Sequence, residues 1–125
     1  MDIKKKRERF LMFANQIKDL GYKVYIKNSE ESAYGYIVNE KDEIGYFQLD
    51  EWGCDLHFGT MHKPSGEFGT GFGIYNYTNE ISKEIIDKVF IKYPVWAKGR
   101  LSAIKKWTAT EFLENNWDKD NIIQL

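Results

Sequence analysis

The chain has 125 residues, of which 42% are hydrophobic, 30% charged and 16% aromatic, and its formal net charge is −1. This length predicts a single domain over residues 1–125 with its own core, and the high aromatic share excludes a disordered tail. The lone cysteine, Cys54, excludes an internal disulfide and a multi-thiolate zinc site, and no apolar run is long enough to cross a bilayer, so we expect a cytoplasmic protein without membrane contact.

The first predicted element is a helix over residues 2–20. Its apolar residues recur at helical spacing, and Gly21 supplies a C-terminal stop. Five basic side chains crowd the first turns, where positive charge opposes the helix dipole: Lys4, Lys5, Lys6, Arg7 and Arg9. This basic cluster is either a solubilising face or an anion contact. It is the one segment for which we keep nucleic acid as a partner.

Five strands are predicted next, and their alternation is typical of an antiparallel meander. They cover about residues 22–27, 33–39, 43–50, 54–62 and 69–75. A three-residue turn at 40–42 predicts a register in which Gly35 faces Phe47 and Ile37 faces Gly45. One face of this hairpin would carry Ala33, Gly35, Ile37, Gly45, Phe47 and Leu49. The other face would carry Tyr34, Tyr36, Val38, Ile44, Tyr46 and Gln48.

Two helices are predicted after the strands, over residues 80–90 and 101–117, and residues 118–125 form a tail that can dock on the body. The predicted fold is therefore α+β. It is an antiparallel meander of about five strands, with the N-terminal helix and the two C-terminal helices packed on one face and the other face open. Gly35 and Gly45, on the helix-side face, would let a helix approach closely.

The charges fall in alternating blocks along the chain. Residues 1–27 carry a balance of +5, residues 28–60 carry −7, residues 61–106 carry +4 and residues 107–125 carry −3. Two interpretations stay open. The blocks attract one another across the folded surface, or the acidic block forms one face for a basic partner.

The glycine-rich segment from Gly66 to Gly73 resembles a phosphate-binding loop only in composition. Its spacing matches neither the dinucleotide-binding pattern nor the P-loop, and it leads into a strand instead of a helix. Gly69, Gly71 and Gly73 share one strand face and leave a bare strip of backbone. Three covers for that strip stay open: a packed aromatic side chain, a ligand or a partner strand.

A small-molecule or metal-dependent site is the alternative hypothesis, with Asp55, His57, His62 and the Gly69–Gly73 strip as its residues. Imidazoles and carboxylates are ligands of divalent metals. Alternation, however, puts Asp55 and His57 on one face and His62 on the other, so they converge only if a bulge intervenes. The leading hypothesis includes no metal, no cofactor and no catalytic residue.

The leading hypothesis concerns the tyrosine face. Tyr34, Tyr36 and Tyr46 would lie on the open side of the sheet, with Glu51 and Trp52 in the turn that follows. Stacked aromatic rings can bind bases, but the acidic block would repel phosphate. Tyrosine with acidic neighbours suits a protein partner, because it combines a large contact area with a polar tip. We therefore expect a non-enzymatic module that binds a protein through these five residues. The competing interpretation is that a helix or the C-terminal tail covers the tyrosines.

Three short phrases carry a resemblance: Gly45-Tyr46-Phe47-Gln48, His62-Lys63-Pro64 and Gly69-Thr70-Gly71-Phe72. They resemble small uncharacterised accessory proteins of phages and mobile elements, over residues 44–96. The resemblance implies context only: an intracellular protein with a phage accessory or anti-defence role, acting on a bacterial host factor. Neither the residues nor the resemblance indicates an oligomeric state.

Overall fold

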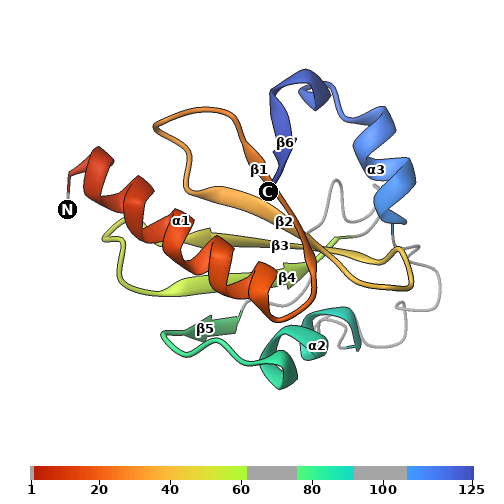
Figure 1. The fold of residues 1–125 in the computed structure, drawn as a ribbon, viewed down its shortest axis with the longest axis horizontal. Coiled ribbons are helices and arrows are strands. Elements are labelled where there is room, and N and C mark those ends of the chain that lie inside the picture. The colour runs from red at the N-terminus through yellow and green to blue at the C-terminus, as the bar shows by residue number, and fades with distance from the viewer. Residues whose placement is uncertain (1, 62–75, 92–106) are drawn as a thin grey trace, which may run out of the picture.

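The computed structural model describes residues 2–61, 76–91 and 107–125 (Figure 1). Its helices are α1 (Ile3–Asp19), α2 (Lys83–Ile91) and α3 (Ala109–Asn115), with a short 3-10 helix, η3, at Lys119–Asn121. Its strands are β1 (Lys23–Lys27), β2 (Tyr34–Val38), β3 (Ile44–Leu49), β4 (Leu56–Thr60), β5 (Asn76–Thr78) and β6 (Ile122–Gln124). The described helices are all too short or too polar to span a bilayer.

The strands form one sheet in the order β5-β4-β3-β2-β1-β6, and every neighbouring pair is antiparallel. The predicted α+β fold with an antiparallel sheet is therefore confirmed. The additional strand is β6, because the C-terminal residues expected as a tail pair with β1, with Ile123 opposite Ile26. The strand predicted over 69–75 lies outside the described residues, and the described β5 pairs with β4 just after that range.

The register of the β2–β3 hairpin is the predicted one, with Gly35 opposite Phe47 and Ile37 opposite Gly45. The connecting turn fixes it through one side chain. The Oδ1 atom of Asn39 accepts hydrogen bonds from the backbone N–H groups of Lys41 and Glu43, each at 3.0 Å. These bonds fix the length of the turn. The apolar side chains of both strands therefore stay on the faces that this register assigns to them.

The first core lies between one face of the sheet and the helices α1 and α2 (Figure 1). The buried rings of Phe10 and Phe47 stack with centroids 5.1 Å apart and join α1 to β3. Gly45 lies beneath α2, where an added Cβ would be 2.6 Å from Cγ1 of Val89. The expectation that glycine lets a helix approach the sheet closely is therefore confirmed at Gly45.

Two of the basic residues of α1 hold the helix on the loops of the sheet. Arg7 donates hydrogen bonds to the carbonyl oxygens of Ser32 at 2.7 Å and Lys27 at 3.1 Å, and Arg9 donates to that of Cys54 at 3.2 Å. Burial lowers the pKa of Arg7, and the charge of Glu30 opposes that shift. These contacts engage two of the five basic residues with backbone carbonyl groups, and nucleic-acid binding by the basic cluster stays a prediction.

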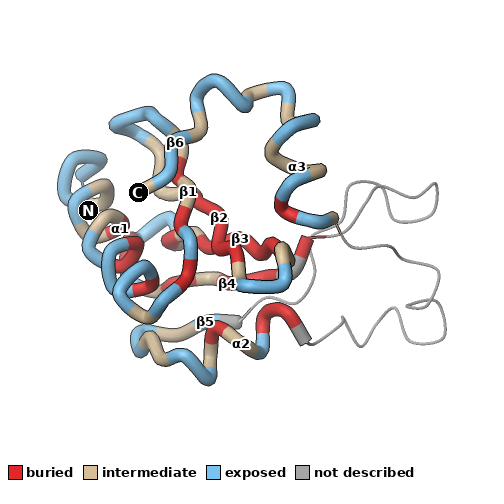
Figure 2. The backbone as a smooth tube through the Cα atoms, turned by 45° about the vertical axis from the view of Figure 1, so that its right-hand side comes forward, coloured by how far each residue is buried: buried red, intermediate tan, exposed pale blue. Residues whose placement is uncertain are grey.

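The C-terminal segment, residues 107–125, covers the second face of the sheet. Figure 2 shows α1 and α3 on opposite sides of the strands. The expectation that all three helices share one face is therefore wrong for α3. The physical reason is a second apolar cluster that needs its own cover, made of Tyr36, Val38, Ile44, Tyr46, Met61 and Ala109. The backbone N–H of Ala109 donates to the carbonyl of Asp42 at 2.7 Å, which anchors the start of α3 at the β2–β3 turn.

Lys27 connects β1 to the end of the C-terminal segment. Its Nζ atom lies 2.9 Å from Oδ2 of Asp118, and it lies 5.9 Å and 5.8 Å from the ring centroids of Tyr36 and Trp117. Hydrogen bonds from Asn121 and from Lys27 hold the pKa of the Asp118 carboxyl below its usual value. One ammonium group therefore contacts a strand ring, an exposed indole and a carboxylate of the covering segment.

Replacing Gly45 by alanine is expected to lower the free energy of unfolding by about 1–3 kcal/mol, because the site is already filled. The added Cβ would meet Val89 at 2.6 Å and the backbone oxygen of Gly59 at 2.9 Å. Urea unfolding measures the loss. Equal midpoints for the Gly45 variant and wild type would contradict the close approach of α2.

Asp118→Asn is expected to lower the melting temperature at neutral pH. The pKa of this carboxyl is lower in the folded chain than in the unfolded chain, so its contacts stabilise the fold above about pH 4. That contribution is lost as the pH falls through the folded-state value. Calorimetric melting of both proteins at a series of pH values should show the difference shrinking in acid. A difference that persists unchanged at about pH 2 would contradict the assignment.

Candidate functional site

The tyrosine face predicted as a docking surface is largely interior. Tyr46 is 1% exposed and Tyr36 is 4% exposed. Phe112 of α3 packs edge-on against Tyr36, with ring centroids 5.0 Å apart. Tyr34 lies half-buried at the margin and stacks on Tyr46, with centroids 5.6 Å apart. The expectation that these rings face solvent is therefore wrong for Tyr36 and Tyr46, because α3 and its flanking residues cover them.

A second row of side chains runs across the same face of the sheet. Tyr34 pairs with Gln48, Gln48 with His57, and His57 with Tyr77. We call these four residues the open strip. Tyr34, Gln48 and His57 are half-buried, and Tyr77 is 66% exposed. Because neighbouring strands are about 4.8 Å apart, the strip crosses four strands over about 14 Å.

The β3–β4 turn lies one residue pair beyond the open strip and is held by its own hydrogen bonds. The backbone N–H of Asp50 donates to the carbonyl of Asp55 at 3.0 Å, and Oδ1 of Asp50 accepts from the N–H of Cys54 at 2.9 Å. Gly53 has φ +73°, a conformation that glycine adopts without strain. The turn therefore holds its exposed side chains on an ordered backbone.

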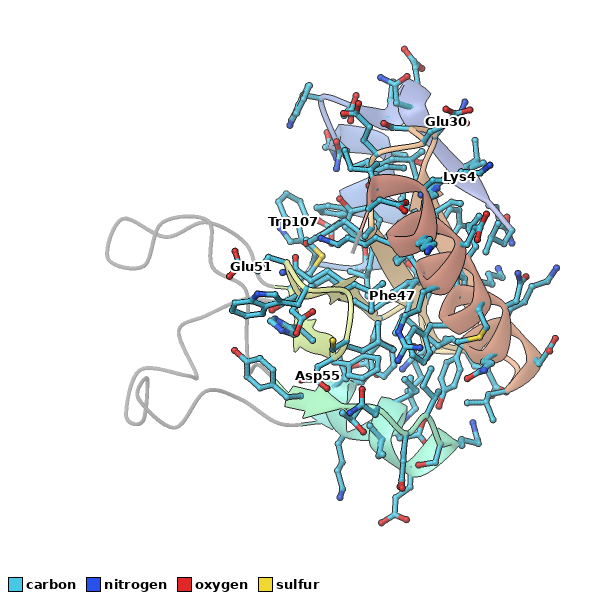
Figure 3. The ribbon with its side chains drawn as sticks, turned by 90° about the vertical axis from the view of Figure 1, so that its left-hand side faces the viewer. Lys4, Glu30, Phe47, Glu51, Asp55 and Trp107 are labelled. Carbon is cyan, nitrogen blue, oxygen red and sulfur yellow. The ribbon has the colours of Figure 1, made fainter. Side chains whose placement is uncertain are left out.

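Those exposed side chains include two of the predicted site residues. Trp52 is 66% exposed, and Glu51 is exposed beside it. Figure 3 shows Glu51 and Trp107 directed toward one side of the sheet and Phe47 directed toward α1 on the other. Cys54 is also exposed. The predicted set is thus divided: Glu51 and Trp52 are accessible, Tyr34 is at the margin, and the other two tyrosines are interior.

His57 is an unexpected feature of the open strip. Its Nε2 atom is buried and has no hydrogen-bond partner in the described parts of the chain. Its ring packs edge-on against Tyr77, with centroids 4.1 Å apart. A buried polar atom left unpaired costs about 1–3 kcal/mol. The atom is buried, so it is not a contact point on the surface of the folded chain.

The alternative metal or small-molecule site lies only partly within the described residues. Asp55 and His57 are described, whereas His62 and the Gly69–Gly73 strip are not. Within the described ranges, no three His, Cys, Asp or Glu side chains gather closely enough to hold a metal ion. The metal or small-molecule site therefore stays a hypothesis, and the structure describes two of its proposed residues, Asp55 and His57.

A hollow beneath the C-terminal segment was not predicted from the sequence. It encloses about 310 Å³, and we call it the aromatic groove. Its described lining is Lys27, Tyr36, Met61, Trp107, Phe112, Asn115, Asn116 and Trp117. No local pattern could have indicated it, because its lining comes from two strands and the C-terminal segment. The exposure of Trp117, at 92%, marks its mouth.

A larger polar cleft, about 420 Å³, lies beside Tyr22. The Tyr22 hydroxyl donates to the carboxylate of Asp87 and lies 3.3 Å from the carbonyl oxygen of Lys83. Burial, followed by the hydrogen bond to Asp87, raises the pKa of Tyr22. The phenol therefore stays protonated at physiological pH and is a poor general base. We interpret this contact as a connection between β1 and α2.

Tyr46→Ala is expected to lower the free energy of unfolding by about 3–5 kcal/mol, because it removes a fully buried ring. Trp52→Ala should change it by less than about 0.5 kcal/mol, because that indole lies on the surface. Urea unfolding of both variants separates the interior tyrosine from the exposed turn. A Tyr46 variant as stable as wild type would contradict the burial of this face.

Comparison with known proteins adds no further assignment. The sequence matches no protein-family model, and no match is found among curated proteins or among solved structures. The open strip, the β3–β4 turn and the aromatic groove are therefore judged on their own geometry and chemistry.

Proposed function

We propose that this protein is a non-enzymatic module that binds a protein partner through the open strip and the β3–β4 turn. The observation that carries the proposal is the pair of exposed aromatic side chains, Trp52 and Tyr77, each 66% exposed. One lies in the ordered turn and the other ends the strip. Large aromatic side chains of this kind supply most of the binding energy at protein interfaces.

The surroundings of these rings favour a protein over nucleic acid. Asp50, Glu51 and Asp55 all belong to the turn, so negative charge borders the surface and would repel phosphate. Tyrosine and tryptophan bury large areas while keeping a polar group for hydrogen bonds, as protein interfaces require.

The order of the turn supports binding in a second way. Association is weakened by the entropy lost when mobile groups become fixed. The backbone around Trp52 is already fixed by the hydrogen bonds of Asp50, so less entropy is lost on binding. The resemblance to phage and mobile-element accessory proteins makes a bacterial host protein the proposed partner.

The test compares the wild-type chain with a Trp52→Ala, Tyr77→Ala double variant as baits in a host lysate, followed by affinity measurement with the purified partner. We expect the double variant to lose at least about tenfold in affinity, because two interface aromatics are removed. Both side chains are exposed, so the variant should retain the wild-type unfolding midpoint.

The matched control removes two exposed apolar side chains of α1 instead, Ile3 and Met12, which are 58% and 45% exposed. This variant should bind the partner as wild type does. Equal affinity of the strip variant and wild type would refute the proposed surface, and loss of binding in the α1 variant alone would move the interface to α1.

A further inference from the structure

The aromatic groove has a preformed wall of packed rings. Phe112 contacts Tyr36 at a centroid distance of 5.0 Å and Trp107 at 6.0 Å, both edge-on. Tyr36 and Met61 form the floor, and both are 4% exposed. These rings fix one another, so the wall exists without a ligand. Trp117, which is 92% exposed, faces the same hollow from the other side.

The charge inside the groove is positive. Among the described residues that line it, Lys27 carries the only formal charge. Its counter-ion, Asp118, lies 2.9 Å away but does not line the hollow. An ammonium group has three N–H donors; Asp118 accepts one of them and the Tyr36 hydroxyl another, which leaves one donor. The groove therefore presents apolar rings and two asparagine side chains together with a cation that retains one donor.

We propose that the aromatic groove binds a small planar aromatic molecule that carries an anionic group, with its ring beside Trp117 and Phe112 and its anion on Lys27. A volume of about 310 Å³ is at the lower limit of small-molecule sites. Aromatic walls favour a flat apolar body through stacking and area burial. The single lysine selects an anion over a neutral or cationic analogue.

This site does not depend on the proposed protein-binding surface. It is lined by β1, β2, Met61 and the C-terminal segment, whereas the proposed protein surface extends to Trp52 and Tyr77. A protein partner could also insert an aromatic side chain into the groove. The size and closed floor of the hollow favour the small molecule, and the test below separates the two.

The test uses indole-3-acetate and its neutral analogue indole-3-acetamide as probes. The chain has four tryptophans, so nitrogen-15 labelling gives four indole N–H signals that single substitutions assign. We expect saturable shifts of the Trp107 and Trp117 signals with a dissociation constant of about 1 mM for a ligand of this size. The Trp52 signal should not move. The acetate should bind roughly fivefold more tightly than the acetamide.

Three variants complete the design. Trp117→Ala should weaken both probes by about tenfold, and Lys27→Met should abolish the preference for the acetate. Asp118→Asn is the more specific test, because it removes the counter-ion of Lys27 and keeps the ammonium group. This variant should raise the affinity for the acetate and leave the affinity for the acetamide unchanged. It tests the role of the Lys27 charge even if the Lys27 variant fails to fold.

Absence of saturable shifts, equal shifts at Trp52, or equal affinity for the two probes would overturn the proposed site. So would an Asp118→Asn variant whose preference for the acetate does not rise. If instead the protein partner of the open strip loses affinity on Trp117→Ala and neither probe binds, the groove takes a partner side chain and the small-molecule proposal is refuted. None of these results bears on the Trp52 and Tyr77 surface, which has its own variant.

Discussion

The burial of the second sheet face beneath the C-terminal segment is the constraint on which the remaining structure depends. Tyr36 and Tyr46 are buried in a cluster to which Ala109 and Phe112 of α3 contribute. The segment is held at both ends, by Asp42 at the start of α3 and by the pairing of β6 with β1. Trp107, Phe112 and Trp117 of this segment line the aromatic groove, and the open strip crosses the same face of the sheet. The open strip and the aromatic groove therefore share this second face.

Short sequence patterns predicted those features of the fold that depend on residues close together in the chain. The β2–β3 register was predictable because a turn of fixed length sets it, and Gly35 and Gly45 were predictable as helix-side residues from that register. Pairings between distant segments were not predictable in the same way. The contact of Ile26 with Ile123 joins residues from opposite ends of the chain, and a three-residue apolar tail carries no strand signal by itself.

The tyrosines show why the candidate site was harder to predict than the fold. Alternation correctly placed Tyr36 and Tyr46 on the face opposite Gly35 and Gly45. Alternation does not indicate whether that face is exposed to solvent, because tyrosine is common both in cores and at surfaces. The covering helix begins at residue 109, far from the strands in sequence. Glu51 and Trp52 were predictable as exposed residues because a tight turn has no room to bury them.

The position of the cover at the end of the sequence has a consequence for biosynthesis. A ribosome releases residues 22–60 well before residues 107–125 exist, so β1 to β4 can pair while Tyr36 and Tyr46 still lack α3. The nascent chain therefore displays an aromatic surface without α3 until residues 107–125 have been synthesised. Such surfaces are where growing chains aggregate and where chaperones bind them. A chain truncated before residue 107 would lack α3 and leave Tyr36 and Tyr46 without the contacts of Ala109 and Phe112.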